Sequence, residues 1–280
     1  MTVWRLAGGI ELAFPPSLAA GIVNVTADSF YEGARSGTSA QAVEDGLRLA
    51  EAGFDLLDVG AVAARSGPPV EAAAEVEKLV PAIAGLAGKA GVPVMADTFQ
   101  PEVARAALDA GAAAINDISG GSDEMFELVA ERSCGYVLMH IEGPPREDRA
   151  PRGYDDIVAY QLEWFAERIA AAVALGVASE QIAIDPGPDF DKGIDDTIEL
   201  VGRISELRAL GRPVMAAISR KDFLGAILAG SWDARAGADE RGAATLAATA
   251  LATAQGAEIL RLHDGEALDA MRVAEAISRG

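Results

Sequence analysis

The sequence is poor in cysteine and in long apolar runs. Cys134 is the only cysteine among the 280 residues, which excludes an intrachain disulfide and a metal site built from cysteines. No uninterrupted apolar run is long enough to span a bilayer, and no signal-peptide pattern opens the chain. We therefore expect a cytoplasmic protein in which Cys134 is a small, buried or half-buried residue.

Positive charge is also scarce. The chain has 23 Lys and Arg residues against 43 Asp and Glu, which gives a formal net charge of −20. Nucleic acid and anionic lipid both need a basic surface, so neither is an expected partner. Of the four lysines, Lys221 alone directly follows a predicted strand. Because an anionic ligand would meet a repulsive overall field, cations near this position become candidates for binding it.

Apolar residues, in contrast, make up half of the chain, and they form eight short runs separated by Ala/Leu/Glu-rich stretches of helical character. The runs cover residues 19–24, 54–58, 92–97, 112–117, 135–140, 182–185, 213–219 and 257–263. Eight buried strands alternating with helices predict an α/β fold, a (β/α)8 TIM barrel, in a single domain over residues 1–280. The segment ahead of the first run predicts a short hairpin through Gly8 and Gly9, placed at the barrel floor.

Nearly every run ends on a polar or ionisable side chain. Because chemistry in this fold takes place where the strands end, these side chains should gather at one mouth. Asp97, Asn116 and Asp185 each close a run, and two carboxylates with one amide suit a heterocycle that carries N–H donors and a ring carbonyl. Asp97 and Asp185 could instead cap the turns that follow them. Three such residues on neighbouring strands favour binding.

Cations follow the last two runs. Lys221 is placed to bond a ring nitrogen or carbonyl, or to neutralise a departing anion. A surface pair with Arg220 at the start of a helix is the alternative, which the helix dipole disfavours. Arg261 and His263 are two residues apart, so they share a strand face and favour phosphate or pyrophosphate binding. His140 has no such partner, and we expect it to be structural or to support a site residue without touching the ligand.

Three polar segments leave two interpretations open. Residues 24–30, NVTADSF, could bind a hard cation or phosphate oxygens, or could form an ordinary Asx-rich turn. The long polar connections over 30–37 and 141–153 are typical of lids or binding loops at the catalytic face. For 141–153, a disordered surface insertion is an equal alternative.

Several motifs occur in a fixed order from about Gly21 to Ile277: NVTADSF, DTF, NDISGG, LMH, DPG-x-x-F-x-K, SRKDFLG and RLHD. This order resembles the dihydropteroate synthase family. The resemblance implies a transferase of folate biosynthesis, which condenses 6-hydroxymethyl-7,8-dihydropterin pyrophosphate with p-aminobenzoate to give 7,8-dihydropteroate and pyrophosphate. The related pterin-dependent methyltransferase domains share the barrel but generally lack the SRK motif, and nothing in the chain indicates a corrinoid partner.

The resemblance also assigns residues by motif position. It implies a pterin site at Asp97, Asn116, Met139, Asp185 and Lys221. It implies a pyrophosphate site at Asn24, Arg261 and His263, with Mg2+ at Asn24, and a p-aminobenzoate site at Phe30, Arg65 and Phe190. Asp97, Lys221 and Arg261 are then the catalytic residues, because they act on the charges that develop as pyrophosphate departs. Family members are commonly dimers, so a homodimer is expected. The apolar surface of 239–255 and 266–278 could form its contact, although ordinary packing of these Ala-rich helices on the barrel explains their composition equally well.

The chain departs from the family pattern in its second loop. Where the family usually reads GGESTRPG, residues 60–67 read GAVAARSG, with apolar side chains at three polar positions. Two hypotheses follow. In one, the protein is a working synthase whose altered loop admits p-aminobenzoate and reduces sulfonamide sensitivity. In the other, it is a pterin-binding paralogue that uses another acceptor or is non-catalytic. The retained SRK and RLH motifs favour the first, since pyrophosphate contacts require a pyrophosphate substrate.

Overall fold

A ring of parallel strands forms the centre of the molecule. The computed structural model describes residues 2–25, 37–64, 67–147 and 149–279. Eight parallel strands form one sheet in the order β8-β7-β6-β5-β4-β3-β10-β9, and a bridge between Ile184 and Val214 nearly closes the ring. The strands are β3 (Leu18–Asn24), β4 (Leu56–Gly60), β5 (Val94–Asp97), β6 (Ala114–Asp117), β7 (Gly135–Met139), β8 (Ile182–Asp185), β9 (Met215–Ala216) and β10 (Ile259–Leu262). The predicted TIM barrel is confirmed.

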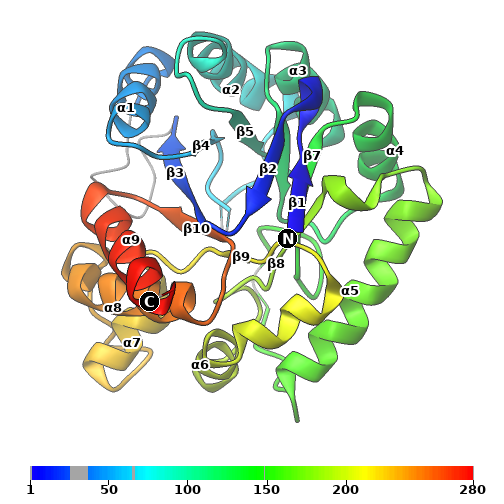
Figure 1. Cartoon of the computed structure of the whole chain (residues 1–280). Coiled ribbons are helices and arrows are strands. Elements are labelled where there is room, and N and C mark those ends of the chain that lie inside the picture. Colours follow the sequence, from blue (N-terminus) through cyan, green and yellow to red (C-terminus); the bar gives the residue numbers. More distant parts are fainter. Residues whose placement is uncertain (1, 26–36, 65–66, 148, 280) are drawn as a thin grey trace.

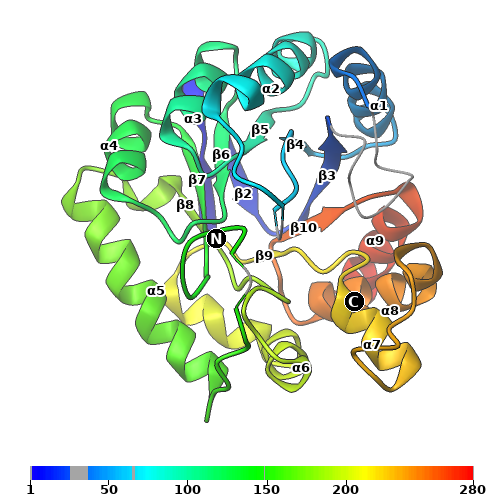
Figure 2. The same ribbon diagram turned by 180° about the vertical axis from the view of Figure 1, so that it is seen from behind.

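Helices surround this ring, following one another around its outside in chain order (Figures 1 and 2). They are α1 (Ser39–Glu51), α2 (Ala72–Leu86), α3 (Pro101–Asp109), α4 (Asp123–Arg132), α5 (Ile157–Ala174), α6 (Ile194–Gly202), α7 (Asp222–Ala229), α8 (Gly242–Ala254) and α9 (Gly265–Arg279). In the described part of the chain, no helix is long and apolar enough to cross a membrane.

The N-terminal hairpin is present and packs where the sequence predicts it. Strands β1 (Thr2–Arg5) and β2 (Glu11–Phe14) pair antiparallel around a short 3-10 turn (Ala7–Gly9). The side chains of Trp4 and Phe14 are fully buried against inward residues of the barrel strands. The Trp4 indole donates a hydrogen bond of 2.7 Å to the carbonyl of Gln181, just before β8. The hairpin therefore closes the floor of the barrel.

Most strand boundaries differ from the predicted runs, and two of the differences affect the site. Strand β4 begins at Leu56 rather than 54, because Gly53 takes a left-handed φ of +94° and the Asp55 carboxylate accepts a bond from the backbone of Ala19. Only two residues of the run 213–219 form strand β9. The chain leaves the sheet after them, and Arg220 adopts a left-handed φ of +55°. At its other end, β4 extends to Gly60, two residues beyond the predicted run. Asp58 therefore lies in the middle of the strand rather than at its end.

The inner and outer faces of the ring are built differently. Outward residues pack with the helices in the main apolar core, whereas the lowest inward residues pack with the hairpin in a second apolar cluster. Cys134, directly before β7, is fully buried, as expected, and burial raises the pKa of its thiol to about 12. The barrel interior above its floor is therefore the place where polar side chains can gather.

Candidate active site

Strand alternation brings one layer of polar side chains into the mouth. In a strand, residues i and i+2 face the same side. The floor-level inward residues are apolar and include Leu56, Met95, Ala114, Val137, Ala183 and Ile259. Two positions further along the same strands lie Asp58, Asp97, Asn116, Met139, Asp185 and Arg261. A single step up the barrel therefore replaces an apolar layer by three carboxylates, an amide, a thioether and a guanidinium.

Asp58, which the sequence analysis did not assign to the site, organises one side of this layer. Its Oδ2 accepts 3.1 Å from the side-chain nitrogen of Asn116 and also accepts from Nε of Arg261. Nη2 of Arg261 donates 2.8 Å to the Asp97 carboxylate. In the described part of the chain, Oδ1 of Asp58 and Oδ1 of Asn116 are buried without a hydrogen-bond partner. These acceptors match a ligand that brings N–H donors.

The protonation of these groups is set mainly by burial. Burial raises the pKa of Asp97 to about 7, against the opposing effect of the Arg261 guanidinium. Burial also raises the pKa of Asp185, while the backbone N–H of Gly187 and the Lys221 ammonium oppose the shift. Although burial disfavours the charged form of Arg261, the carboxylates of Asp58 and Asp97 raise its pKa. A ligand that donates hydrogen bonds to Asp97 and Asp185 would therefore stabilise their charged forms, which burial disfavours.

Asp185 and Lys221 bring the polar layer to an apolar wall. Oδ1 of Asp185 accepts 2.8 Å from the backbone of Gly187, so the turn after β8 orients this carboxylate. The Lys221 ammonium lies 4.3 Å from the ring centroid of Phe190, a cation–π contact. Phe190 packs in a small apolar cluster with Ile118, Met139 and Ile141, against which Ala64 and Phe99 rest. A flat ligand would therefore meet polar groups at its edge and apolar groups on its face.

The next inward level holds the predicted anion-binding residues. Asn24 ends β3, two positions beyond Ile22, and His263 directly follows the adjacent strand β10, two positions beyond Arg261. Nδ1 of His263 lies 2.8 Å from the Ser219 hydroxyl. Burial lowers the pKa of His263 well below its usual range, and the cations of Arg261, Arg220 and Lys221 add to this. His263 is thus neutral at pH 7 and offers a hydrogen bond rather than a charge.

His140 is placed outside the mouth, which agrees with its predicted structural role. It follows the inward Met139 and is fully buried, with ring contacts to Tyr160, Trp164 and Phe165 of α5. Burial lowers the pKa of His140 to about 2, so the ring is neutral. Among the described residues, neither ring nitrogen makes a hydrogen bond.

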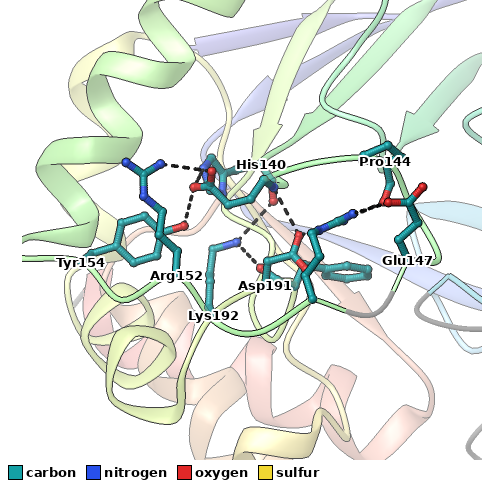
Figure 3. Close-up of polar contacts among 10 residues, drawn as sticks. His140, Pro144, Glu147, Arg152, Tyr154, Asp191 and Lys192 are labelled. Atoms are coloured by element: carbon teal, nitrogen blue, oxygen red, sulfur yellow. Dashed lines mark hydrogen bonds and ion pairs between the residues drawn. The ribbon is translucent and has the colours of Figure 1, made fainter.

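The loops around the mouth are joined by arginines of the segment 141–153. Arg146 donates to the carbonyl of Ala63 and, at 2.8 Å, to that of Pro68, both in the loop between β4 and α2. Arg149 donates 2.6 Å to the Pro144 carbonyl and 3.2 Å to Asp191, which lies after β8 (Figure 3). Phe30 and Arg65, predicted for p-aminobenzoate, lie outside the described residues, as does most of the loop 30–37.

Comparisons with known proteins agree with this geometry. The profile of the family described as "Pterin binding enzyme" matches residues 20–263. Dihydropteroate synthase of Escherichia coli K12 is 33% identical over 279 residues, covering 99% of this chain and 96% of that protein.

Two solved structures extend the similarity to three dimensions. Xanthomonas albilineans dihydropteroate synthase with 4-aminobenzoic acid is 38% identical with a TM-score of 0.87, and each chain is fully covered. The Yersinia pestis enzyme in a sulfonamide drug complex is 31% identical with a TM-score of 0.89, and 98% of each chain is covered. These matches confirm the resemblance and the transferase class predicted from the motifs. The chain belongs to the pterin-binding enzyme family, within which it is a dihydropteroate synthase.

Proposed function

We propose that the protein joins 6-hydroxymethyl-7,8-dihydropterin pyrophosphate to p-aminobenzoate through the residues of the mouth. The pterin lies in the polar layer, where Asp97, Asn116 and Asp185 pair with its ring N–H and carbonyl groups. Lys221 bonds a ring nitrogen or carbonyl, and Met139 contacts the ring face. The observation that carries this assignment is the set of acceptors that β5, β6 and β8 present in one layer, including the unpaired Oδ1 of Asn116 in the described part of the chain.

The pyrophosphate occupies the level above, against Asn24 and His263, with Arg261 of the polar layer beneath it. Neutral His263 donates a hydrogen bond, while Arg261 supplies positive charge. Among the described residues, no group of three or more His, Cys, Asp or Glu is placed to hold a metal ion. Mg2+ nevertheless fits here, because this ion is commonly held by one or two protein oxygens together with substrate phosphates, and Asn24 offers an amide oxygen. Bound Mg2+ would neutralise charge on the departing pyrophosphate.

The reaction is a substitution at the exocyclic methylene carbon of the pterin. The carbon–oxygen bond breaks first, and pyrophosphate leaves with the electron pair while a cation forms on the pterin methylene. The amine nitrogen of p-aminobenzoate then forms the new bond and loses a proton to water. Asp97 opposes the positive charge, and Arg261 favours the departing anion. No general base is needed before bond formation, because the nitrogen lone pair is already available.

The p-aminobenzoate ring binds beside Phe190 and Lys221, together with Phe30 and Arg65 from the two loops. Support comes from the apolar cluster around Phe190, against which Ala64 of the altered loop rests. The similar Xanthomonas enzyme was solved with 4-aminobenzoic acid, and the Yersinia enzyme with a sulfonamide. An apolar Ala64 keeps the wall of this site while removing a polar side chain that could recognise a drug.

The function is tested by incubating the purified protein with Mg2+, dihydropterin pyrophosphate and p-aminobenzoate, and measuring dihydropteroate and pyrophosphate separately. We expect equal amounts of both. Pyrophosphate without dihydropteroate would point to another acceptor, and neither product in a protein that binds pterin would contradict the catalytic assignment. Omission of Mg2+ from the same assay tests whether the reaction needs the metal, and we expect product formation to fall without it.

A homodimer through α8 and α9 is also part of the proposal. These helices pack on each other and carry exposed apolar side chains at Leu251, Val273 and Ile277, of which Ile277 is 75% exposed. Exposed apolar side chains of this size would gain from burial against a second copy of the chain. Sedimentation of the protein and of a variant Ile277→Glu tests this. A cytoplasmic location stays a prediction, to be tested by fractionation.

A further inference from the structure

The segment between β8 and α6 holds Phe190 between two residues of unusual backbone conformation. Asp189 has a φ of +68° and Asp191 a φ of +55°. Residues other than glycine rarely adopt this left-handed region, although aspartate does so more readily than most. Such conformations persist where surrounding contacts over-determine them, and they are concentrated at functional sites. The contacts of these two residues therefore indicate what the conformation achieves.

Asp189 joins this segment to the start of helix α7. Its carboxylate is 3% exposed, and both oxygens lie 3.2 Å from the backbone nitrogen of Phe223 in the first turn of that helix. A carboxylate is favoured at a helix N-terminus by its N–H groups and by the helix dipole. The N-cap position of α7 is Lys221, whose side chain has no acceptor for those N–H groups. Asp189, from another segment of the chain, therefore supplies the capping hydrogen bond that the N-cap residue of α7 cannot make.

Asp191 and Lys192 fasten the other side of Phe190 to β7 and the loop that follows it (Figure 3). Oδ2 of Asp191 accepts 3.3 Å from the backbone of Glu142 and 3.2 Å from Arg149. The ammonium of Lys192, a residue only 3% exposed, donates 2.8 Å to the carbonyl of Phe190 and 3.3 Å to that of His140. The segment of Phe190 is therefore tied to helix α7 on one side and to the chain that follows β7 on the other.

These ties are needed because the segment borders open space. A cavity of about 760 Å³ is lined by residues 189–195 and by apolar side chains that include Ile198, Ile227 and Trp232. On the side that faces the cavity, the segment has no close-packed neighbours within the described part of the chain to hold it. Its position therefore depends on the polar contacts of Asp189, Asp191 and Lys192. The tie through Asp189 is the one that reaches α7, and it places the Phe190 ring against the Lys221 ammonium at 4.3 Å.

We infer that Asp189 is a positioning residue, which sets the distance between Phe190 and Lys221 and thereby the wall of the arylamine site. The inference rests on the proposed function, in which these two residues face p-aminobenzoate. Asp189 itself contacts no substrate. It acts by holding two groups from different elements in one arrangement, so its loss should affect the arylamine and spare the pterin.

The variant Asp189→Gly tests this, because glycine accepts the left-handed backbone and only the carboxylate is lost. We expect the KM for p-aminobenzoate to rise about tenfold, the scale of one lost aromatic or cation–π contact, with the Kd of a pterin unchanged. A second measurement needs no turnover: the ratio of the pterin Kd to the dihydropteroate Kd should fall by a similar factor. Asp189→Asn, which keeps an acceptor oxygen but not the charge, should raise the KM only about two- to threefold.

Asp156→Gly is the matched control. Asp156 accepts 2.9 Å from the backbone of Ala159 and so caps α5, as Asp189 caps α7. Its loss should lower the Tm without changing the KM for p-aminobenzoate. A normal KM and affinity ratio in both Asp189 variants of an active enzyme would overturn the inference alone, as would an equal KM rise in Asp156→Gly. A wild-type protein that forms no dihydropteroate would instead overturn the proposed function beneath it.

Discussion

The two halves of the mouth are positioned by different physical means. On the side proposed to bind the pterin, Asp97, Asn116 and Asp185 stand on strands whose pairing fixes their height and direction. On the side proposed for the arylamine, Phe190 stands in a loop that is held by contacts of Asp189 and Lys192. A strand position is shared with the whole sheet, whereas a loop position depends on a few individual contacts. We therefore expect the position of Phe190 to be more easily changed by a single substitution than the positions of the three strand residues.

The largest expected effect is on the strand side. Asp185→Ala should abolish measurable pterin binding, because donors of the ligand would be buried without their charged acceptor, at a cost of roughly 2–5 kcal/mol. Calorimetry with a pterin measures this. Asp55→Ala is the matched control, since Asp55 bonds the backbone of Ala19 near the other end of the barrel. The control should lose stability and keep its pterin affinity; retained affinity in Asp185→Ala would remove the pterin from this layer.

Arg261 tests whether the strand side also holds the anion. Arg261→Ala should weaken the pyrophosphate-bearing substrate about 10- to 100-fold and a pterin without that group much less, because a charge-assisted contact is lost only with the former. Arg261→Lys keeps the charge but not the paired donors to Asp58 and Asp97. Its affinity for the pyrophosphate-bearing substrate should lie between those of the unchanged protein and Arg261→Ala. Equal losses for the two ligands would place Arg261 outside the pyrophosphate site.

The raised pKa of Asp97 gives a pH test of the same half. Protons and pterin compete for this carboxylate, so lowering the pH from 8 to 6 through a pKa of about 7 should weaken pterin binding. The expected loss is about tenfold, since one unit below its pKa only about a tenth of a group is ionised. Asp97→Asn should bind weakly at both pH values and show a flat profile. A pH-dependent affinity that survives in this variant would assign the titration to another group.

The smallest effect concerns the loop side. Changing Ala63 and Ala64 to the Ser and Thr usual in the family should lower the inhibition constant of a sulfonamide only a few-fold, the scale of one neutral hydrogen bond. The pterin Kd should not change, because the strand half does not depend on this loop. An inhibition constant equal to that of the unchanged protein would dismiss the idea that the altered loop reduces drug sensitivity.

Much of the strand half was predictable from the sequence. Asp97, Asn116 and Asp185 each end an apolar run, and the barrel converts that pattern into one inward layer. Asp58 ends the run FDLLD in the same way, yet its importance was missed. The pattern that identified the other three residues also applies to Asp58. Because the predicted strand ended at residue 58 and β4 continues to Gly60, Asp58 lies in the same layer as those residues rather than at the rim of the barrel. Its contacts to Asn116 and Arg261 depend on side-chain directions across three strands.

The loop half was much less predictable. Phe190 was named only through the family resemblance, and nothing in the letters DPGPDFDK indicates two left-handed aspartates. Aspartate at such a φ is uncommon, so no local pattern predicts it. Contacts of the two aspartate carboxylates come from residues far away in sequence, such as Phe223 and Glu142. Local chemistry sets where a strand ends, but long-range contacts set where a loop rests.

The single thiol of the chain has a practical consequence for following these loops. Thiolates are the reactive form of cysteine, and Cys134 is fully buried with its pKa raised to about 12. The native protein is therefore nearly silent to maleimides and to thiol-linked spin or fluorescent labels. One cysteine introduced at an exposed position of the 141–153 loop would carry such a label alone, without removal of a native residue. Distances between that label and a bound ligand could then report loop motion during turnover.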